Sequence, residues 1–351
     1  PTDFLALCTS NLPDPAVIPS EHFNTVAYAG TGSNQSINTV GFAPDLFWIK
    51  QRNNNYNHIW MDSVRGIGKT LKSDRDNAET DYGTGQLTSF DSDGFSLKSS
   101  GEYVNLSGST YVAWNWKAGG TGASNTSGSI TSTVSANADA GFSIVSYSGT
   151  GSGGTIGHGL SSAPEMVIVK RRDSVNDWAT QHTYNTTKYL LLNATYAEQS
   201  DTAFFNATAP TSSVYSVNGN NATNGSGATY IAYCFHSVDG YSKVGSYTGN
   251  GSADGTFVYT GFRPAYAMVK ATASAEHWMI FDSERSNYNV VDDYFKANDV
   301  DAEDVNHVSI RVDFLSNGFK VRGSNAGVNH NGNTMIYLSF AEHPFKHTNA
   351  R

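Results

Sequence analysis

The chain has 351 residues, of which 22 are basic and 31 acidic, so its formal net charge is −9. This length allows two or three domains, and a hydrophobic content of 38% is enough to build their cores. The acidic balance leaves no basic stripe for a phosphate backbone, so we expect no nucleic acid partner. No apolar run approaches the ~18 residues that span a bilayer, and we expect no membrane insertion.

Composition also indicates the fold class. Only 15% of the residues are charged, whereas glycine occurs 34 times and tyrosine 19 times. Small hydroxyl and amide side chains outside, with β-branched and aromatic residues inside, are typical of all-β extracellular or virion proteins. Cys8 and Cys234, the only cysteines, lie far apart and form neither a disulfide framework nor a metal-binding pair. Because the chain begins at Pro1 without methionine, we expect a fragment or a processed protein.

One pattern of predicted strands occurs three times along the chain. The phrase Tyr-x-Gly-x-Gly-Ser stands at 28–33, 147–152 and 247–252. Each copy is followed by a proline and an apolar strand that ends in a lysine six residues later: Pro44 and Lys50, Pro164 and Lys170, Pro264 and Lys270. Each copy closes with a threonine and an alternating aromatic strand, at 110–116, 229–235 and 334–340. Such self-similarity predicts structural repeats.

The boundaries of the predicted units follow from this pattern. We expect an all-β protein of three tandem β-sandwich-like repeats, of lectin or jelly-roll type, at 22–118, 141–236 and 240–351, the last including a C-terminal tail. Residues 119–140 are a predicted Gly/Ser/Thr linker with one strand, and 237–239 are a linker so short that the units beside it must touch. In residues 1–21, Phe4–Cys8 alternates like a closing strand, so we interpret this part as the last strand of an upstream unit and a linker.

The stretch Gly149–Gly154 (GTGSGG) fits the spacing of a dinucleotide-binding fingerprint. Its counterparts read GTGSNQ and GNGSAD, so the third glycine is missing from two copies. Two glycines and a proline follow within ten residues, which leaves no helix N-terminus to receive a pyrophosphate. We therefore predict a turn between two strands, and we expect no cofactor.

Candidate catalytic and metal-binding groups have no complete signature. Asp62 with Glu79, and Asp282 with Glu303, could form the carboxylate pair of a glycosidase, but the middle copy has His182 in place of the aspartate. We favour structural hydrogen bonds instead, such as one from each aspartate to the arginine three residues later. Acidic loops lack the distal glutamate of a calcium site. The ten histidines form no zincin pair, and we expect them at the surface.

The polar loop that follows the first Pro-to-Lys strand is the candidate ligand site. It contains Arg52, Asn54, Asn55, Tyr56 and His58, and one tyrosine among amides and an arginine can stack on and hydrogen-bond a sugar. The other two copies read RRDSVND and ATASAEH at the same place, so the loop varies on a frame that is kept. Variable loops on a repeated frame are where recognition is usually found. A solvated hairpin tip is the alternative interpretation.

Several phrases resemble the repeat-bearing virion proteins of tailed phages, which are common in marine and cyanobacterial phages. The phrases are FLALCTSNLP (4–13), SFDSDGF (89–95), YVAWNWKAGG (111–120), GYSKVGSYTGNGS (240–252) and YTGFRP (259–264). The resemblance implies a virion component, of the kind called tail fibre or structural protein, with a lectin-like β-sandwich upstream. It carries no catalytic residues to this chain.

We therefore expect a non-enzymatic tail-fibre or adhesin segment on the virion surface, which contacts host-surface polysaccharide through loops. Its expected partners are other virion proteins and further copies of itself, with a homotrimer as the default for fibres. Weak contacts of an amide-rich surface with glycans would gain strength from avidity. Two alternatives stay open: a capsid decoration or head-fibre protein without a ligand, and a polysaccharide depolymerase.

Overall fold

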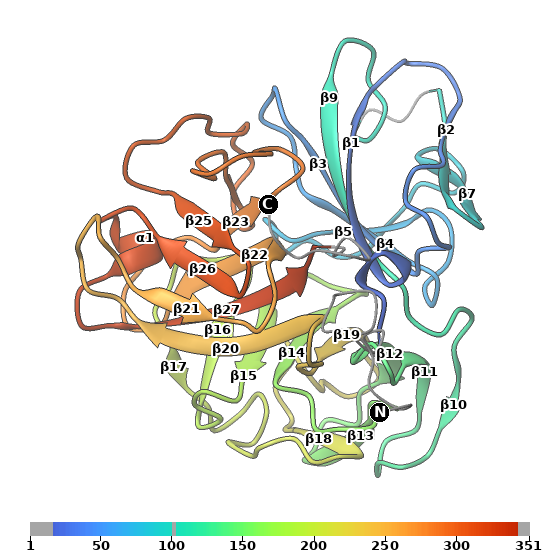
Figure 1. The fold of residues 1–351 in the computed structure, drawn as a ribbon. Helices are drawn as coiled ribbons and strands as arrows, with labels where there is room; N and C mark the ends of the chain where they lie inside the picture. The colour runs from blue at the N-terminus through green and yellow to red at the C-terminus, as the bar shows by residue number, and fades with distance from the viewer. Residues whose placement is uncertain (1–16, 100–102, 343–351) are drawn as a thin grey trace, which may run out of the picture.

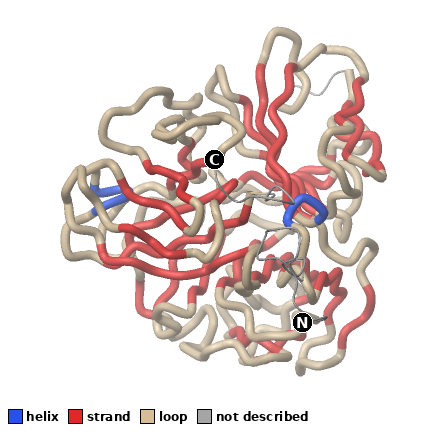
Figure 2. Tube along the Cα trace, viewed as in Figure 1, coloured by secondary structure: helices blue, strands red, loops and turns tan. Residues whose placement is uncertain are grey.

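The chain folds almost entirely into β-strands, as its composition predicts. The computed structural model describes residues 17–99 and 103–342, which form three large and three small sheets. Figure 2 shows the strands throughout this part of the chain, with two short helices, η2 (Pro19–Glu21) and α1 (Ala326–Asn329). Neither helix is long and apolar enough to cross a membrane. The segment Phe4–Cys8, for which we expected a trailing strand, lies outside the described residues.

The three large sheets, named I, II and III here, follow one another along the chain. Sheet I has the order β1 (Phe23–Ala29), β9 (Thr110–Trp116), β3 (Leu46–Gln51), β4 (Ile59–Asp62), β5 (Lys69–Lys72), β6 (Thr80–Asp81). Sheet II has the order β10 (Ala123–Asn125), β11 (Ser132–Asn137), β12 (Phe142–Ser148), β19 (Thr229–Phe235), β14 (Met166–Arg171), β15 (Trp178–His182), β16 (Lys188–Leu191), β17 (Gln199–Ser200). Sheet III has the order β20 (Ser242–Thr248), β27 (Thr334–Ala341), β22 (Pro264–Ala271), β23 (Met279–Asp282), β24 (Phe295–Lys296).

Each large sheet places its last strand in the chain between its opening strand and the strand after the proline. Thus β9 lies between β1 and β3, β19 between β12 and β14, and β27 between β20 and β22, all antiparallel. A central strand is covered on both faces, which explains why apolar side chains occupy both sides of these three strands. They begin at Thr110, Thr229 and Thr334, where the sequence predicts them.

A small sheet covers the outer face of each large one. The small sheets are β2 (Gln35–Ile37), β8 (Gly94–Leu97) and β7 (Leu87–Asp91); β13 (Gly154–Gly157) and β18 (Val214–Val217); β21 (Phe257–Tyr259), β26 (Gly318–Val321) and β25 (Val312–Leu315). In the first pair of layers, Phe47 of β3 packs edge to face on Phe95 of β8, with 4.8 Å between ring centroids. Separate outer hydrophobic clusters form in this way on sheets I, II and III.

The segment between the first two predicted repeats contains more structure than expected. Residues 119–140 hold two strands, β10 and β11, instead of one. The strand that we predicted there corresponds to β11, which pairs with β12 and so extends sheet II. The polar strand β10 was missed because Ala123–Asn125 has no apolar alternation and is placed by its pairing with Val134, Thr133 and Ser132.

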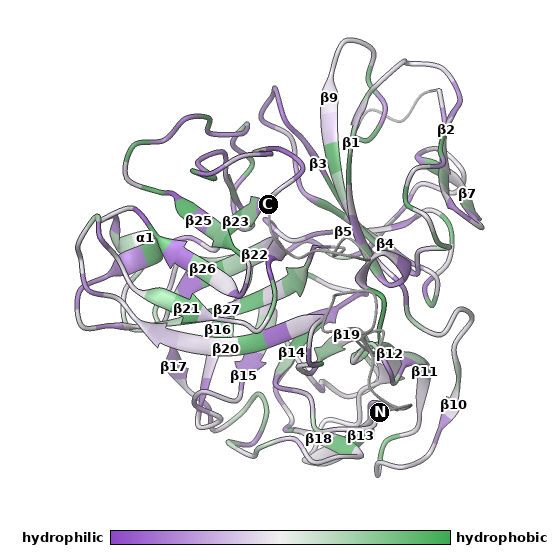
Figure 3. Cartoon of the chain, in the orientation of Figure 1, coloured by the Kyte–Doolittle hydropathy of each residue, from purple (hydrophilic) through white to green (hydrophobic). Residues whose placement is uncertain are grey.

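The inner faces of the three large sheets share one hydrophobic core. Figure 1 shows sheet I at the upper right, sheet II below and sheet III on the left, gathered around a common centre. There Trp116, Phe235 and Phe340, which hold the same position in β9, β19 and β27, contact one another at centroid distances of 5.7 to 6.5 Å. In Figure 3 hydrophobic residues gather on the strands, and the connecting loops are mostly pale or hydrophilic. Each large sheet is thus buried on both faces.

Candidate functional site

The three large sheets touch in pairs, and each contact uses the lysine that ends the Pro-to-Lys strand. The Nζ of Lys50 donates to the carbonyl of Val300 at 3.1 Å, joining sheet I to the segment after β24. Lys170 donates to the backbone carbonyl of Asp76 at 3.1 Å, and Lys270 to that of Thr195 at 2.9 Å. The contacts therefore run I to III, II to I and III to II, which closes a ring. Burial lowers the pKa of each lysine to about 8.

Backbone and ring groups repeat the same contacts. The N–H groups of Glu79, Glu198 and Glu303 donate to the carbonyls of Arg172, Thr272 and Arg52 at 2.7 to 2.8 Å. The indole Nε1 of Trp178 donates to Lys72 O, and that of Trp278 to Leu191 O, each at 2.9 Å. At the corresponding position the buried ring of His58 lies beside the backbone of Lys296. One set of polar contacts is thus built three times.

At two of the three contacts an ion-pair network is added. Between sheets I and II, the Nε of Arg65 binds Asp62 at 2.5 Å, and its Nη1 binds Glu79 at 3.2 Å. Arg172 then holds both carboxylate oxygens of Glu79, at 2.9 and 3.0 Å. Tyr233 of β19 donates to Asp62 at 2.8 Å and completes the network across the core. The expected hydrogen bond between the aspartate and the arginine three residues later is confirmed, with the arginine as donor.

The contact between sheets III and I has the same arrangement. Arg285 binds Asp282 at 2.6 Å and Glu303 at 2.8 Å, while Arg52 binds the second oxygen of Glu303 at 2.8 Å. Here the Nε1 of Trp114, which takes the place of Tyr233, donates to Asp282 at 2.9 Å. The side chains of both central arginines are fully buried, and each is charge-compensated by two carboxylates.

Electrostatics favour the ionised form of the Glu79 carboxyl. Burial acts to raise the pKa of Glu79, but hydrogen bonds and charge from Arg172 and Arg65 outweigh it and lower that pKa. Burial acts to lower the pKa of Arg65, yet Asp62, Tyr233 and Glu79 together raise it. A carboxyl held ionised in this way is a poor general acid, because proton donation needs a pKa near the working pH.

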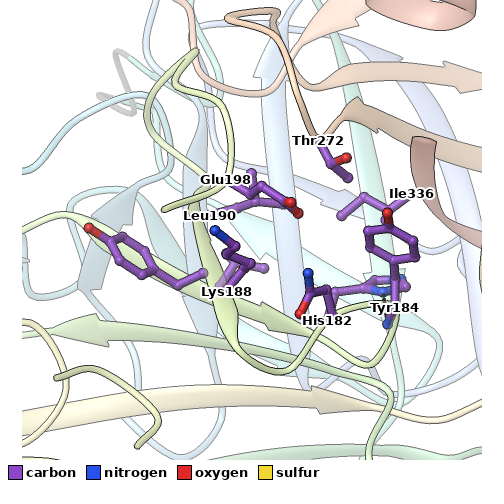
Figure 4. A pocket seen from close by; sticks show the side chains of 10 residues that line it. His182, Tyr184, Lys188, Leu190, Glu198, Thr272 and Ile336 are labelled. Atoms are coloured by element: carbon purple, nitrogen blue, oxygen red, sulfur yellow. Dashed lines mark hydrogen bonds between the residues drawn. The ribbon is translucent and has the colours of Figure 1, made fainter. Parts of the chain in front are cut away.

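The contact between sheets II and III lacks this network. His182 stands where Asp62 and Asp282 stand, Asn185 takes the place of Arg65, and Thr272 takes the place of Arg172. A pocket opens here, and Figure 4 shows Glu198, Lys188 and Thr272 around it. Burial lowers the pKa of His182 to about 4.

The predicted sugar-binding loop is largely occupied by contacts with sheet III. Arg52 is bound to Glu303, and the side-chain oxygen of Asn55 accepts the N–H of Ala302 at 2.9 Å. Asn54 is exposed, and Tyr56 is half-buried with its ring edge-to-face against Tyr103 at 5.9 Å. His58 is fully buried and accepts the Nε1–H of Trp48 at 2.8 Å. Its ring cannot stack on a ligand at the surface in this conformation.

Other candidates from the sequence have plain structural roles. Residues 149–153 of the GTGSGG stretch link β12 to β13, with Gly151 at φ 77°, so the predicted turn is confirmed. Cys234 is buried, and its burial raises the thiol pKa to about 12. In residues 17–99 and 103–342, no three His, Cys, Asp or Glu side chains gather to hold a metal ion. The expectation of surface histidines is wrong for four of them, which pack inside the sheets: His58, His158, His182 and His236.

One exposed aromatic pair was missed by the sequence analysis. Phe257 and Tyr259, at alternate positions of β21, are 43% and 66% exposed. They pair with Lys320 and Gly318 of β26, and the absence of a side chain at Gly318 leaves the ring of Tyr259 uncovered on that side. Residues 155 and 157 of β13 correspond to this pair but are threonine and glycine. The signal available in the sequence was the pair of aromatic residues at alternate positions, Phe257 and Tyr259, on either side of a valine.

The chain was compared with known families and proteins. No curated protein matches it at a significant level. A family model described as "Domain of unknown function (DUF7483)" matches residues 18–344, which is nearly the whole chain. The chain with its three sheet contacts therefore belongs to the DUF7483 family, whose function is unknown.

Proposed function

We propose that this protein is a non-enzymatic virion component of a tailed phage, built from three tandem β-sandwich-like units, and that it serves as a tail-fibre or adhesin segment that contacts host-surface glycans. Each unit would be one large sheet with its small sheet, and the units would share the central core. The resemblance of the repeated phrases to phage virion proteins supports the virion assignment. The observation that carries the non-enzymatic role is the use of the candidate catalytic carboxylates as structural ion pairs.

The argument against a depolymerase starts from Asp62 and Glu79. Arg65 lies between the two carboxylates and binds both, so the space that a glycosidic bond would need is filled by a guanidinium. The Asp282 and Glu303 pair is held in the same way by Arg285. A glycosidase needs one carboxyl that can donate a proton and an open path between the two. We expect no new reducing ends when the purified protein is incubated with bacterial polysaccharide.

The glycan-binding role is supported by the outer face of β21. Phe257 and Tyr259 offer two exposed rings from one face of a strand. Charged side chains border them: Lys320 donates to Gly255 O at 3.0 Å and forms an ion pair with Asp254 at 2.8 Å. Aromatic faces beside fixed polar groups suit the apolar and hydroxyl faces of a sugar ring. We therefore place glycan contact on this strand and not in the 52–58 loop.

The test is binding of the purified protein to a panel of bacterial surface polysaccharides, measured by biolayer interferometry. We expect Phe257→Ala/Tyr259→Ala to weaken binding by about tenfold or more, the loss typical of a central aromatic contact. Tyr288→Ala is the matched control, because Tyr288 is 85% exposed but lies away from this strand in the sequence. Absence of binding by the unaltered protein, or an equal loss in both variants, would contradict the adhesin role.

A capsid decoration role is the second candidate, and the burial of the tryptophans favours it. All six tryptophans of the chain are buried, and within residues 17–99 and 103–342 the strongly exposed aromatic side chains are all tyrosine or phenylalanine: Tyr184, Tyr196, Phe257, Tyr259 and Tyr288. A scaffold without a ligand would keep its large rings inside in this way. Electron cryomicroscopy of the particle separates the two: density at the tail supports the adhesin, and density on capsid lattice points supports decoration.

A further inference from the structure

The pocket between sheets II and III is explained neither by the sequence pattern nor by the proposed function. It is a shallow hollow, partly open to solvent, and is lined by Thr180, His182, Tyr184, Glu198, Thr272 and Ile336 among others. Figure 4 shows the carboxylate of Glu198 pointing into the space that faces Thr272 and Ile336. Its enclosed part has space for about one water molecule, so a larger group would lie partly in the open mouth of the hollow.

The other two sheet contacts show what normally fills this position. The carboxylate of Glu79 lies between two guanidinium groups, Arg65 at 3.2 Å and Arg172 at 2.9 and 3.0 Å. Glu303 lies in the same way between Arg285 and Arg52, each at 2.8 Å. A planar guanidinium with parallel N–H donors matches the two oxygens of a carboxylate. Each of these glutamates thus has two cationic partners from its own chain.

At the third contact both guanidinium groups are replaced while the backbone frame is kept. The N–H of Glu198 still donates to Thr272 O at 2.7 Å, as Glu79 does to Arg172 O at 2.7 Å. Yet the side chains are Asn185 and Thr272, which are too short to reach across. Leu338 replaces the Tyr233 and Trp114 of the other networks, so the donor across the core is lost as well. The pocket lies where the two arginines would be.

Glu198 keeps its acidic group in this altered setting. Its carboxylate has no hydrogen bond or ion pair with any residue that the structure describes, and it is half-buried. Burial raises its pKa, and the charge of Lys188 opposes that rise. Lys188 itself points its ammonium at the hydroxyl of Ser200, at 3.1 Å, as Lys69 points at Asp81 in sheet I. The glutamate therefore has both oxygens available for a further cation.

We propose that this pocket binds a guanidinium group supplied from outside the chain, with the carboxylate of Glu198 as its main acceptor. The Thr272 hydroxyl donates to Thr334 O at 3.2 Å and keeps its lone pairs for one more N–H. The wall of Ile336 gives the flat face of the group an apolar surface. The group could belong to a free guanidino compound or to an arginine side chain of a protein, and both present the same chemistry.

The test measures binding of methylguanidinium to the full chain by NMR titration, with tetramethylammonium at equal ionic strength as the reference cation. We expect methylguanidinium to bind at the pocket and tetramethylammonium not to bind. Glu198→Gln should weaken it about tenfold to a hundredfold, the effect of losing a charged hydrogen-bond acceptor. Glu276→Gln is the control, because this partly buried glutamate is outside the pocket lining, and it should leave binding unchanged.

Two further variants test the same pocket without changing Glu198. Thr272→Arg restores the arginine of the other contacts and should abolish methylguanidinium binding in a folded protein. Lys188→Gln removes the competing positive charge and should strengthen binding severalfold. Binding of N-acetylarginine amide in addition would assign the site to a partner's arginine, and exclusion of it would assign the site to a free compound. Equal binding of both cations, or an unchanged affinity in Glu198→Gln, would overturn the proposal.

Discussion

The contact between sheets I and II and the contact between sheets II and III use the same backbone frame but differ in charge. Both have the lysine that bonds to the neighbouring loop and the glutamate N–H that bonds to the next sheet. Only the contact between sheets I and II has the ion-pair network of Asp62, Arg65, Glu79 and Arg172. The large sheets meet at both contacts, with the arginine network and without it. The lysine and backbone hydrogen bonds are therefore sufficient to join two sheets, and the arginine network is added to them.

The largest expected effect comes from breaking the arginine network where it exists. Arg65→Ala leaves the buried carboxylate of Asp62 without its ion-pair partner, so we expect a loss of about 3–5 kcal/mol in the free energy of unfolding. Asn185→Ala is the matched control at the corresponding position and should lose less than about 1 kcal/mol. Urea unfolding followed by circular dichroism checks both. Equal losses of unfolding free energy in Arg65→Ala and Asn185→Ala would contradict the claim that only one of these contacts is stabilised by an ion-pair network.

A second effect depends on pH and comes from His182, at the contact that lacks arginines. The pKa of His182 is about 4 in the folded protein, below the ordinary 6.5, because the ring is buried. Between these two values the unfolded chain binds the extra proton, so stability rises with pH there. This contribution is complete above pH 6.5 and is lost as the pH falls towards 4, with a slope of at most about 1.4 kcal/mol per pH unit.

The measurement is the free energy of unfolding at several pH values for the unaltered protein and for His182→Gln. The variant should show a shallower dependence between pH 4 and 6.5, since its side chain does not titrate. The same slope in both proteins would mean that the ring is protonated in the folded state.

The third effect should be alike at all contacts. Replacing Lys170 or Lys270 with methionine keeps the length of the side chain but removes the donor from the buried carbonyls that it serves. An unsatisfied buried acceptor costs about 1–3 kcal/mol, and we expect both variants to fall in that range. Thermal unfolding of the two variants is the measurement. A loss at Lys170 but none at Lys270 would show that the two contacts do not share one frame.

The sequence predicts the strands well because their patterns are local. The Pro-to-Lys spacing identifies β3, β14 and β22, and the alternation after Thr110, Thr229 and Thr334 identifies the central strands. A strand that is buried on both faces carries its signal in consecutive residues, so neighbours in the sequence are enough. The small sheet that covers sheet II has two strands, whereas the other small sheets have three. The sequence indicates this difference, because the Phe-x-Ser-Asx-Gly-Phe hairpin at 90–95 and 314–319 is missing from the middle copy.

The sheet contacts could not be predicted, because they join residues that are far apart in the chain. Lys50 meets Val300, and Arg52 meets Glu303, across about 250 positions. Arg52 and Asn55 look like solvent-exposed loop residues until the third sheet is placed beside them. His58 was misjudged because it follows a polar loop, although it precedes β4 and faces the shared core. The triplicated lysine was visible in the sequence, but its role required the fold.

The central claim is that the three large sheets form one closed structure around a common core. Unfolding in urea tests it most directly, with tryptophan fluorescence to report on the shared core and far-ultraviolet circular dichroism to report on the strands. All six tryptophans belong to that core. We predict a single transition with the same midpoint by both probes. Two or three separate transitions would contradict the claim and would show that the sheets fold independently.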